Sequence, residues 1–203
     1  MSELHEYCMR CGFPFKEATT QEVCSSAEAC DKRLSDPTYR VPQGRLSAIE
    51  VRVRWSLIER VQATDPSYPL RARISYQDLC AENDPDRRYW VPPRFRGIGK
   101  VLGRISTYEH ENGRPLLSCL AVHRANQQAG PGFAVLAREL GYGIPTGGER
   151  DFWASQVEAV VQYWNEPGRS ASGPNPTAQA LALITNAAEQ LEQARRLLDA
   201  LQH

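Results

Sequence analysis

Four cysteines near the start of this 203-residue chain are the residues best suited to chemistry. Cys8 and Cys11 form a C-x2-C pair, and Cys24 and Cys30 form a second, wider pair. A C-x2-C turn places two thiolates on one side of a metal ion, and Gly12 permits the sharp backbone turn. The second pair completes a tetrahedral four-sulfur shell, which favours zinc. The sequence therefore predicts one Zn²⁺ held by these four cysteines.

The segment 1–35 has too few apolar side chains to fold alone, so metal binding is expected to supply most of its folding free energy. Its C-x2-C-G start and later Cys-Ser…Cys pair resemble the short zinc-ribbon modules at the ends of bacterial DNA-associated proteins. That resemblance implies a structural zinc that also contacts a partner. A closed four-cysteine shell also leaves no coordination position for a catalytic water. The prediction is a zinc ribbon over 1–35.

Composition narrows the classes of protein. Basic and acidic residues balance at 24 each, so any affinity for nucleic acid must come from a local patch. The sequence has neither an N-terminal apolar leader nor an 18-residue apolar run, from which we expect no membrane partner and a cytoplasmic location. Cysteines in a reducing compartment rarely form disulfides, which agrees with a metal site.

A basic segment interrupts this balance: eight basic residues and two acidic ones lie between Arg87 and Arg124. Such a segment can neutralise phosphates, and arginines on it can read guanine edges. The predicted nucleic-acid contacts are Arg94, Arg96, Lys100, Arg104, Thr107, Arg114 and Arg124. Trp90, in the adjoining loop, is expected to stack on a base. We expect DNA rather than RNA as the partner.

The elements that must position these residues are mostly helices. Apolar spacing predicts a helix over 46–61, and Ser75 with Asp78 predicts the start of a short helix within 74–80. A basic helix over 94–107 and an extended strand over 114–124 follow. Helix, short helix, basic helix, strand and turn is the order of a winged helix-turn-helix, whose third helix enters the DNA major groove.

Two further helices, at 133–140 and 149–164, complete a predicted domain over 46–165. A linker is predicted over 166–176 because it is rich in Gly, Pro and Ser. Residues 177–203 lack Pro and Gly, and apolar residues three and four apart predict a coiled-coil helix there. We expect homo-oligomerisation or a helical protein partner through 177–202. The predicted fold class is mainly α with a small β component.

The central region resembles the winged-helix domain of alkylguanine-DNA alkyltransferases. The similarity is carried by Ile-Ser-Tyr-Gln-Asp-Leu at 74–79, Ile-Gly-Lys-Val-Leu-Gly at 98–103, Val-His-Arg at 122–124 and Gly-Phe at 132–133. Where that family has a reactive Pro-Cys-His-Arg motif, this chain has Ala-Val-His-Arg at 121–124. The resemblance therefore implies a DNA-binding scaffold that performs no alkyl transfer.

Within that resemblance, Arg96, Lys100 and Arg104 occupy the positions of the DNA-binding helix. The predicted function is a non-catalytic nucleic-acid-binding or regulatory protein. Two alternatives remain open. The zinc ribbon and the C-terminal helix would recruit a protein partner in an adaptor. Glu109, His110 and Glu111 would instead bind a catalytic metal in a nuclease, although such clusters after a helix are usually solvated turns.

Overall fold

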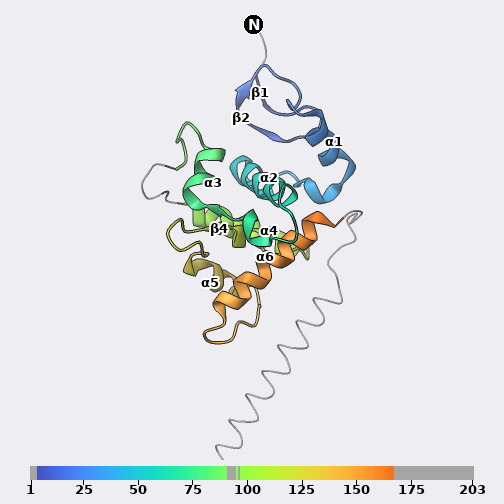
Figure 1. Cartoon of the computed structure of the whole chain (residues 1–203). Helices are drawn as coiled ribbons and strands as arrows, with labels where there is room; N and C mark the ends of the chain where they lie inside the picture. Colours follow the sequence, from blue (N-terminus) through green and yellow to red (C-terminus); the bar gives the residue numbers. More distant parts are fainter. Residues whose placement is uncertain (1–3, 91–94, 96, 167–203) are drawn as a thin grey trace, which may run out of the picture.

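The computed structural model describes residues 4–90, 95 and 97–166, and it confirms a mainly α fold with a small β component (Figure 1). The elements are β1 (His5–Tyr7), β2 (Pro14–Thr19), α1 (Ala27–Ser35), η1 (Pro37–Tyr39), α2 (Ala48–Gln62), η2 (Pro69–Ala72), β3 (Ile74–Ser75), α3 (Tyr76–Asn83), α4 (Ile98–Glu111), η3 (Leu117–Leu120), β4 (Ala121–Val122), α5 (Pro131–Glu139) and α6 (Glu149–Asn165). No helix among the described residues is long and apolar enough to cross a membrane. The predicted C-terminal helix at 177–203 and all of the linker except Glu166 lie outside the described residues.

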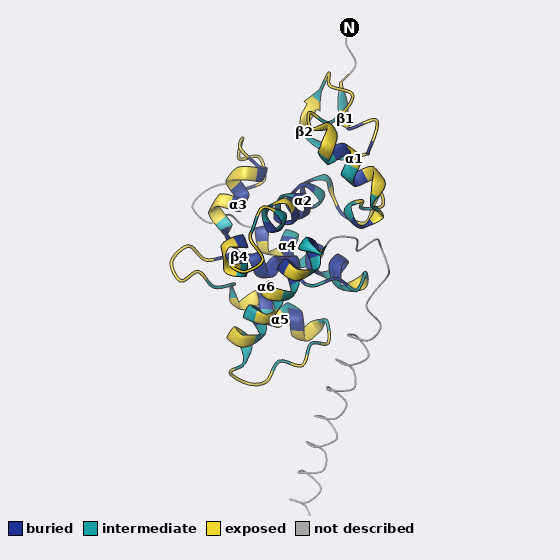
Figure 2. Ribbon diagram, turned by 45° about the vertical axis from the view of Figure 1, so that its right-hand side comes forward, coloured by how far each residue is buried: buried dark blue, intermediate teal, exposed yellow. Residues whose placement is uncertain are grey.

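Helix α2 lies at the centre of this arrangement. The hairpin of β1 and β2, together with α1, forms an N-terminal module on one side of α2, and α4 and α6 lie on its other side (Figures 1 and 2). A capping box starts α2, in which the Glu50 side chain accepts from the Ser47 backbone N–H at 2.7 Å. Because neighbours cover most of its circumference, Arg52 and Arg54 are buried as well as its apolar residues.

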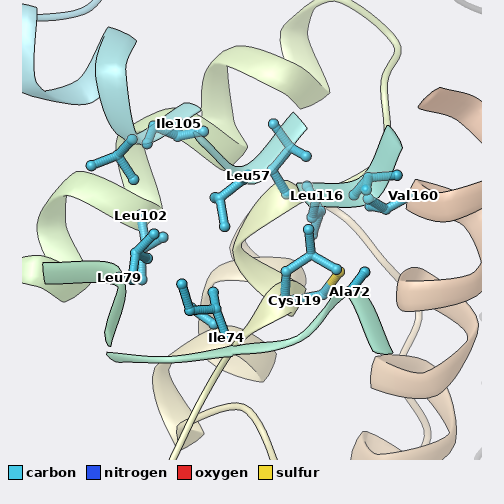
Figure 3. Packing of buried hydrophobic residues seen from close by; sticks show 14 of the residues in the cluster. Leu57, Ala72, Ile74, Leu79, Leu102, Ile105, Leu116, Cys119 and Val160 are labelled. Atoms are coloured by element: carbon cyan, nitrogen blue, oxygen red, sulfur yellow. The ribbon is translucent and has the colours of Figure 1, made fainter. Parts of the chain in front are cut away.

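The main core forms where these helices meet. Figure 3 shows side chains of α2, β3, α3, α4, η3 and α6 converging, among them Leu57, Ile74, Leu79, Leu102, Ile105, Cys119 and Val160. All of these side chains are buried. Full burial of one such aliphatic side chain contributes about 1.5–3 kcal/mol, so the packing of α4 against α2 fixes which face of α4 stays exposed.

Local signals set several boundaries as predicted. Ser75 caps α3, accepting from the Asp78 N–H at 3.1 Å. The final helix α6 runs from Glu149 to Asn165 and ends one residue beyond the predicted 149–164. These boundaries are confirmed because capping side chains and apolar periodicity act within a few residues of one another.

The predicted extended strand over 114–124 is wrong for most of its length. Leu117–Leu120 is a 3-10 helix, and only Ala121–Val122 is a strand. This strand pairs in parallel with β3, so the described residues contain no antiparallel wing hairpin after α4. A run of apolar residues buried on all sides has no alternation that distinguishes a strand from a tight helix. Ser106 stabilises the turn by accepting from the Ser118 N–H at 3.0 Å.

Glu109 is fully buried, which contradicts the expectation of a solvated turn at 109–111. Its carboxylate accepts from Arg54 Nε at 2.5 Å and from Arg114 Nε. Arg54 also donates to the backbone oxygens of Thr38 and Tyr39, so this guanidinium links η1 to the carboxylate that joins α2, α4 and the segment after α4. A buried charge is stable only when paired and hydrogen-bonded, as it is here.

Replacing Glu109 with Gln should destabilise the fold by about 3–5 kcal/mol, because two buried guanidinium groups would lose their counter-charge. Glu111→Gln is the matched control, since the Glu111 side chain is about half exposed and pairs with the equally exposed Arg45. Its cost should be about 0–1 kcal/mol. Urea denaturation measures both values. Equal unfolding midpoints for the two variants would contradict a structural role of the Glu109 carboxylate.

Candidate metal centre and basic helix face

The four predicted cysteines come together in the N-terminal module. Their Sγ atoms all lie within 4.8 Å of one another, in a cluster able to hold a metal ion. The Cys8 and Cys30 sulfurs are 3.8 Å apart, and those of Cys11 and Cys24 are 3.5 Å apart. Zinc–sulfur bonds of about 2.3 Å place the sulfurs of a tetrahedral shell about 3.8 Å apart. The four sulfurs therefore already stand near the spacing that a tetrahedral metal requires.

The first pair is positioned by a tight backbone turn. The Cys11 N–H points to Cys8 Sγ at 3.4 Å, and the Gly12 N–H donates to the Cys8 oxygen at 2.8 Å. Gly12 has a φ of 71°, a left-handed conformation that a residue with a Cβ adopts only with strain. The turn directs both sulfurs to one side, as the C-x2-C-G sequence predicts.

The second pair has its wider spacing because a helix begins inside it. Ser26 caps α1, accepting from the Ala29 N–H at 3.1 Å, and Cys30 follows within the first turns of α1. Cys24 stands in the loop before this cap, so the intervening residues form the helix start. The C-x5-C spacing thus combines one loop ligand with one helix ligand around the same centre.

Arg33 is a component of the site that sequence reasoning missed. Its guanidinium donates to Cys24 Sγ at 3.1 Å and lies between two aromatic rings, 4.0 Å from the Phe13 centroid and 4.4 Å from that of Trp55. Four thiolates around a divalent cation carry a net charge of −2, which a buried guanidinium offsets. The one available signal was Arg33 following Cys30 by three residues, on the same side of a helix.

The thiols of this cluster differ in acidity. Burial acts to raise the pKa of Cys8, but hydrogen bonds from the Cys11 and Arg10 backbone and from the Cys24 and Cys11 thiols outweigh it and lower the pKa to about 6. Burial and hydrogen bonds with the Cys8 and Cys11 thiols raise the pKa of Cys24 to about 12, against the opposing effect of Arg33. A metal must therefore displace protons from this cluster, and its affinity should fall as pH falls.

One aromatic contact and two polar contacts join the N-terminal module to the main domain. Phe13 meets Trp55 of α2 edge to face, with ring centroids 6.1 Å apart. Arg52 donates to the Phe15 oxygen at 2.8 Å, and Arg88 pairs with Glu17 at 2.9 Å. The module that carries the cysteine cluster therefore covers part of α2.

Three of the predicted nucleic-acid contacts share one face of α4. Lys100 and Arg104 are exposed and Thr107 is half-buried between them and the helix end. Arg104 Nε pairs with Glu50 at 3.2 Å, while its own side chain remains 61% exposed. Arg124 is also exposed, away from α4, and pairs with Asp78 at 2.8 Å.

Two other predicted contacts are corrected by the structure. Trp90 is only 3% exposed, because the carboxylate of Asp84 accepts the N–H groups of Arg88, Tyr89 and Trp90 and draws that loop inward. Its ring is therefore not exposed for base stacking. Arg114 is buried against Glu109. The last two predicted contacts, at 94 and 96, lie outside the described residues.

Comparisons of the chain with protein-family models, with curated proteins and with solved structures find no match. Two features of the described residues therefore remain to indicate function. One is a four-cysteine cluster that can hold a metal ion, and the other is the exposed face of α4.

Replacing Cys24 with Ser should abolish metal binding and unfold the N-terminal module, because the shell loses a ligand and Arg33 loses its acceptor. Cys80→Ala is the matched control, since Cys80 is equally a cysteine but is buried in the main core. Elemental analysis should give one metal ion per chain for the unmodified protein and the control. A value far below one for the unmodified protein would contradict the site.

Proposed function

We propose that this chain is a DNA-binding protein without catalytic activity, in which a structural zinc ion supports the fold and α4 contacts the DNA. The cysteine cluster supports zinc because soft thiolate ligands in a closed tetrahedral shell suit that ion and leave no open coordination position. The residues that would hold it are Cys8, Cys11, Cys24 and Cys30. The ion would contribute folding free energy, and the side chains of α4 would contact the DNA.

The observation that carries the proposal is the composition of the exposed face of α4. Gly99, Lys100, Gly103 and Arg104 follow one another along it, and the only acids of α4, at 109 and 111, lie at its C-terminal end. A Cβ built at either glycine meets no atom within 4 Å. Each glycine inside a helix costs about 1 kcal/mol relative to alanine, and nothing packed nearby in the described chain requires it.

Bare backbone between two cations suits a partner that approaches closely and carries negative charge. A helix of this kind can enter the major groove, where Lys and Arg contact phosphates and guanine edges. The α4 cations would supply part of the salt-dependent affinity expected of such an interface. This use agrees with the resemblance of the central region to a DNA-binding winged-helix domain. Contact through α4 does not require an antiparallel wing hairpin, which the described residues lack after α4.

A protein-recruiting adaptor is the second candidate, and exposed apolar residues on the N-terminal module favour it. Met9 is 71% exposed at the tip of the first cysteine turn, and Val23 is 45% exposed beside Cys24. The Met9 N–H donates to the Glu22 backbone oxygen at 2.7 Å, so Met9 and Val23 lie in neighbouring turns. In this version the module and the predicted self-associating segment 177–202 would bind proteins, and binding would be insensitive to salt.

The nuclease alternative has less support. Its proposed ligand Glu109 already accepts from two buried arginines, so it has little capacity left for a catalytic metal. Glu111 pairs with Arg45 at the surface. Cleavage of DNA that requires Mg²⁺ and is lost in Glu111→Gln would favour the nuclease over the proposed function.

Fluorescence anisotropy of labelled duplex DNA should show binding that weakens steeply as salt rises. Lys100→Ala should weaken binding and make the slope of log affinity against log salt shallower by about 0.9, the value for one phosphate contact. Arg138→Ala is the control, because Arg138 forms an exposed pair with Glu149 on α5 and α6. Single-stranded DNA and RNA probes measured alongside establish which nucleic acid is preferred.

Absence of binding to every probe by the zinc-loaded protein would overturn the proposed function and favour the adaptor. Binding that is unchanged in Lys100→Ala would move the contact away from α4. An equal loss in Arg138→Ala would show that net charge alone drives association.

Gly103→Ala separates a structural from a binding role of the α4 glycine. Because a Cβ meets nothing at this position, the substitution should stabilise the fold by about 1 kcal/mol in urea denaturation. It should nevertheless weaken DNA binding, since the methyl group would stand between α4 and the DNA. Gly132→Ala is the control, as Gly132 lies in α5 with equal open space. Undiminished binding by Gly103→Ala would contradict close approach at this face.

A further inference from the structure

An open hollow continues the basic face of α4 toward its C-terminal end. It has a volume of about 420 Å³ and lies between the segment that precedes α2 and the last turns of α4. Its lining residues are Gly44, Arg45, Arg104, Thr107, Tyr108 and Glu111. Arg104 stands about one helical turn from Lys100, roughly 6 Å along the axis, so the hollow adjoins the proposed DNA-contacting face.

Two guanidinium groups reach this hollow from different elements. Arg104 comes from α4, and Arg45 comes from the chain that leads into α2. The Thr107 hydroxyl belongs to the same lining and can donate a further hydrogen bond. Arginine presents its donors as a planar fork that matches the oxygens of a phosphate, so a phosphodiester is the anion suited to this lining.

The Arg104 side chain is fixed by an ion pair but remains exposed to such a ligand. Its Nε pairs at 3.2 Å with Glu50, whose side chain is 5% exposed and is itself fixed by the Ser47 N–H at 2.7 Å. The pair occupies Nε of Arg104 but leaves the side chain 61% exposed. An arginine fixed in this way loses little conformational freedom when it binds an anion.

Arg45 is held differently, by a carboxylate that can be displaced. Its partner Glu111 lines the same hollow, and both side chains are about half exposed. Exposed pairs of this kind contribute little stability, so exchanging the carboxylate for another anion is inexpensive. Glu111 therefore occupies, in the unbound protein, the position of an anion that bridges from α4 to Arg45.

We propose that this hollow binds a backbone phosphate of duplex DNA, with Arg45 and Arg104 as donors, and that Glu111 competes with the phosphate for Arg45. The inference rests on the proposed function and adds to it a contact that the sequence did not indicate, because Arg45 precedes the basic segment. Glu111 limits affinity: the phosphate must displace its carboxylate, and its charge repels the backbone.

Two variants of the full-length zinc-loaded protein test this site by anisotropy with the same duplex at several salt concentrations. Arg45→Ala should weaken binding and reduce the salt slope by about 0.9. Glu111→Gln should tighten binding, because Arg45 is released and a nearby negative charge is removed. The double variant Arg45→Ala with Glu111→Gln should recover only the part of the affinity that repulsion by Glu111 had cost.

Controls separate the hollow from general charge. Arg138→Ala removes an equally paired surface arginine, and Glu6→Gln removes an exposed carboxylate on the N-terminal module, across α2 from α4. Neither should reproduce the effects at Arg45 and Glu111. Urea midpoints of all variants establish that they are folded.

The outcomes distinguish this inference from the function on which it rests. Failure of the unmodified protein to bind duplex DNA overturns both. Binding that depends on Lys100 but is unchanged by Arg45→Ala and Glu111→Gln overturns the phosphate site alone. Tightening by Glu6→Gln as large as that by Glu111→Gln would assign the effect to net charge and would also overturn the competition by Glu111.

Discussion

Helix α2 has almost no solvent-facing side, and this constraint shapes the rest of the molecule. Its side chains bond to neighbours on opposite sides: Arg52 donates to the N-terminal module, whereas Arg54 pairs with the buried Glu109 of α4. Trp55 packs against Phe13 of the module and Val53 belongs to the main core. The apolar side of α2 is covered by the main core. Its charged side needs polar partners, which the N-terminal module supplies.

This position explains how a metal ion bound at the cysteine cluster would affect α4. The centre includes Arg33, which is sandwiched between the module's Phe13 and the Trp55 ring of α2. If the cysteine cluster holds a metal ion, loss of that ion would remove the negative charge that Arg33 offsets, and the module would be expected to release α2. The exposed face of α4 is set by its packing on α2, η3 and α5, so the module that covers α2 is connected through α2 to the basic face of α4.

Features governed by short-range chemistry were predictable from the sequence, and features governed by long-range contacts were not. The cap at Ser75 and the turn at Gly12 depend on residues a few positions away. Glu109 was expected in a solvated turn because one of its two partners, Arg54, is 55 residues distant in the sequence. Trp90 was expected to be exposed because the sequence does not show that the Asp84 carboxylate accepts its backbone N–H. Arg45 was missed because an isolated arginine carries no periodic signal, and Arg33 because its spacing from Cys30 does not by itself indicate the contact with Cys24.

The packing of α6 against α2 sets an order of events during synthesis. The Asn165 side chain donates to the Val61 oxygen across 104 positions, so one flank of α2 has no partner until α6 has been made. The cysteine ligands, by contrast, are complete at residue 30. At a typical elongation rate of 5–20 residues per second, roughly 7 to 27 s separate the two points. During that interval the N-terminal module, which precedes α2 in the chain, can already cover the side of α2 that carries Arg52 and Trp55.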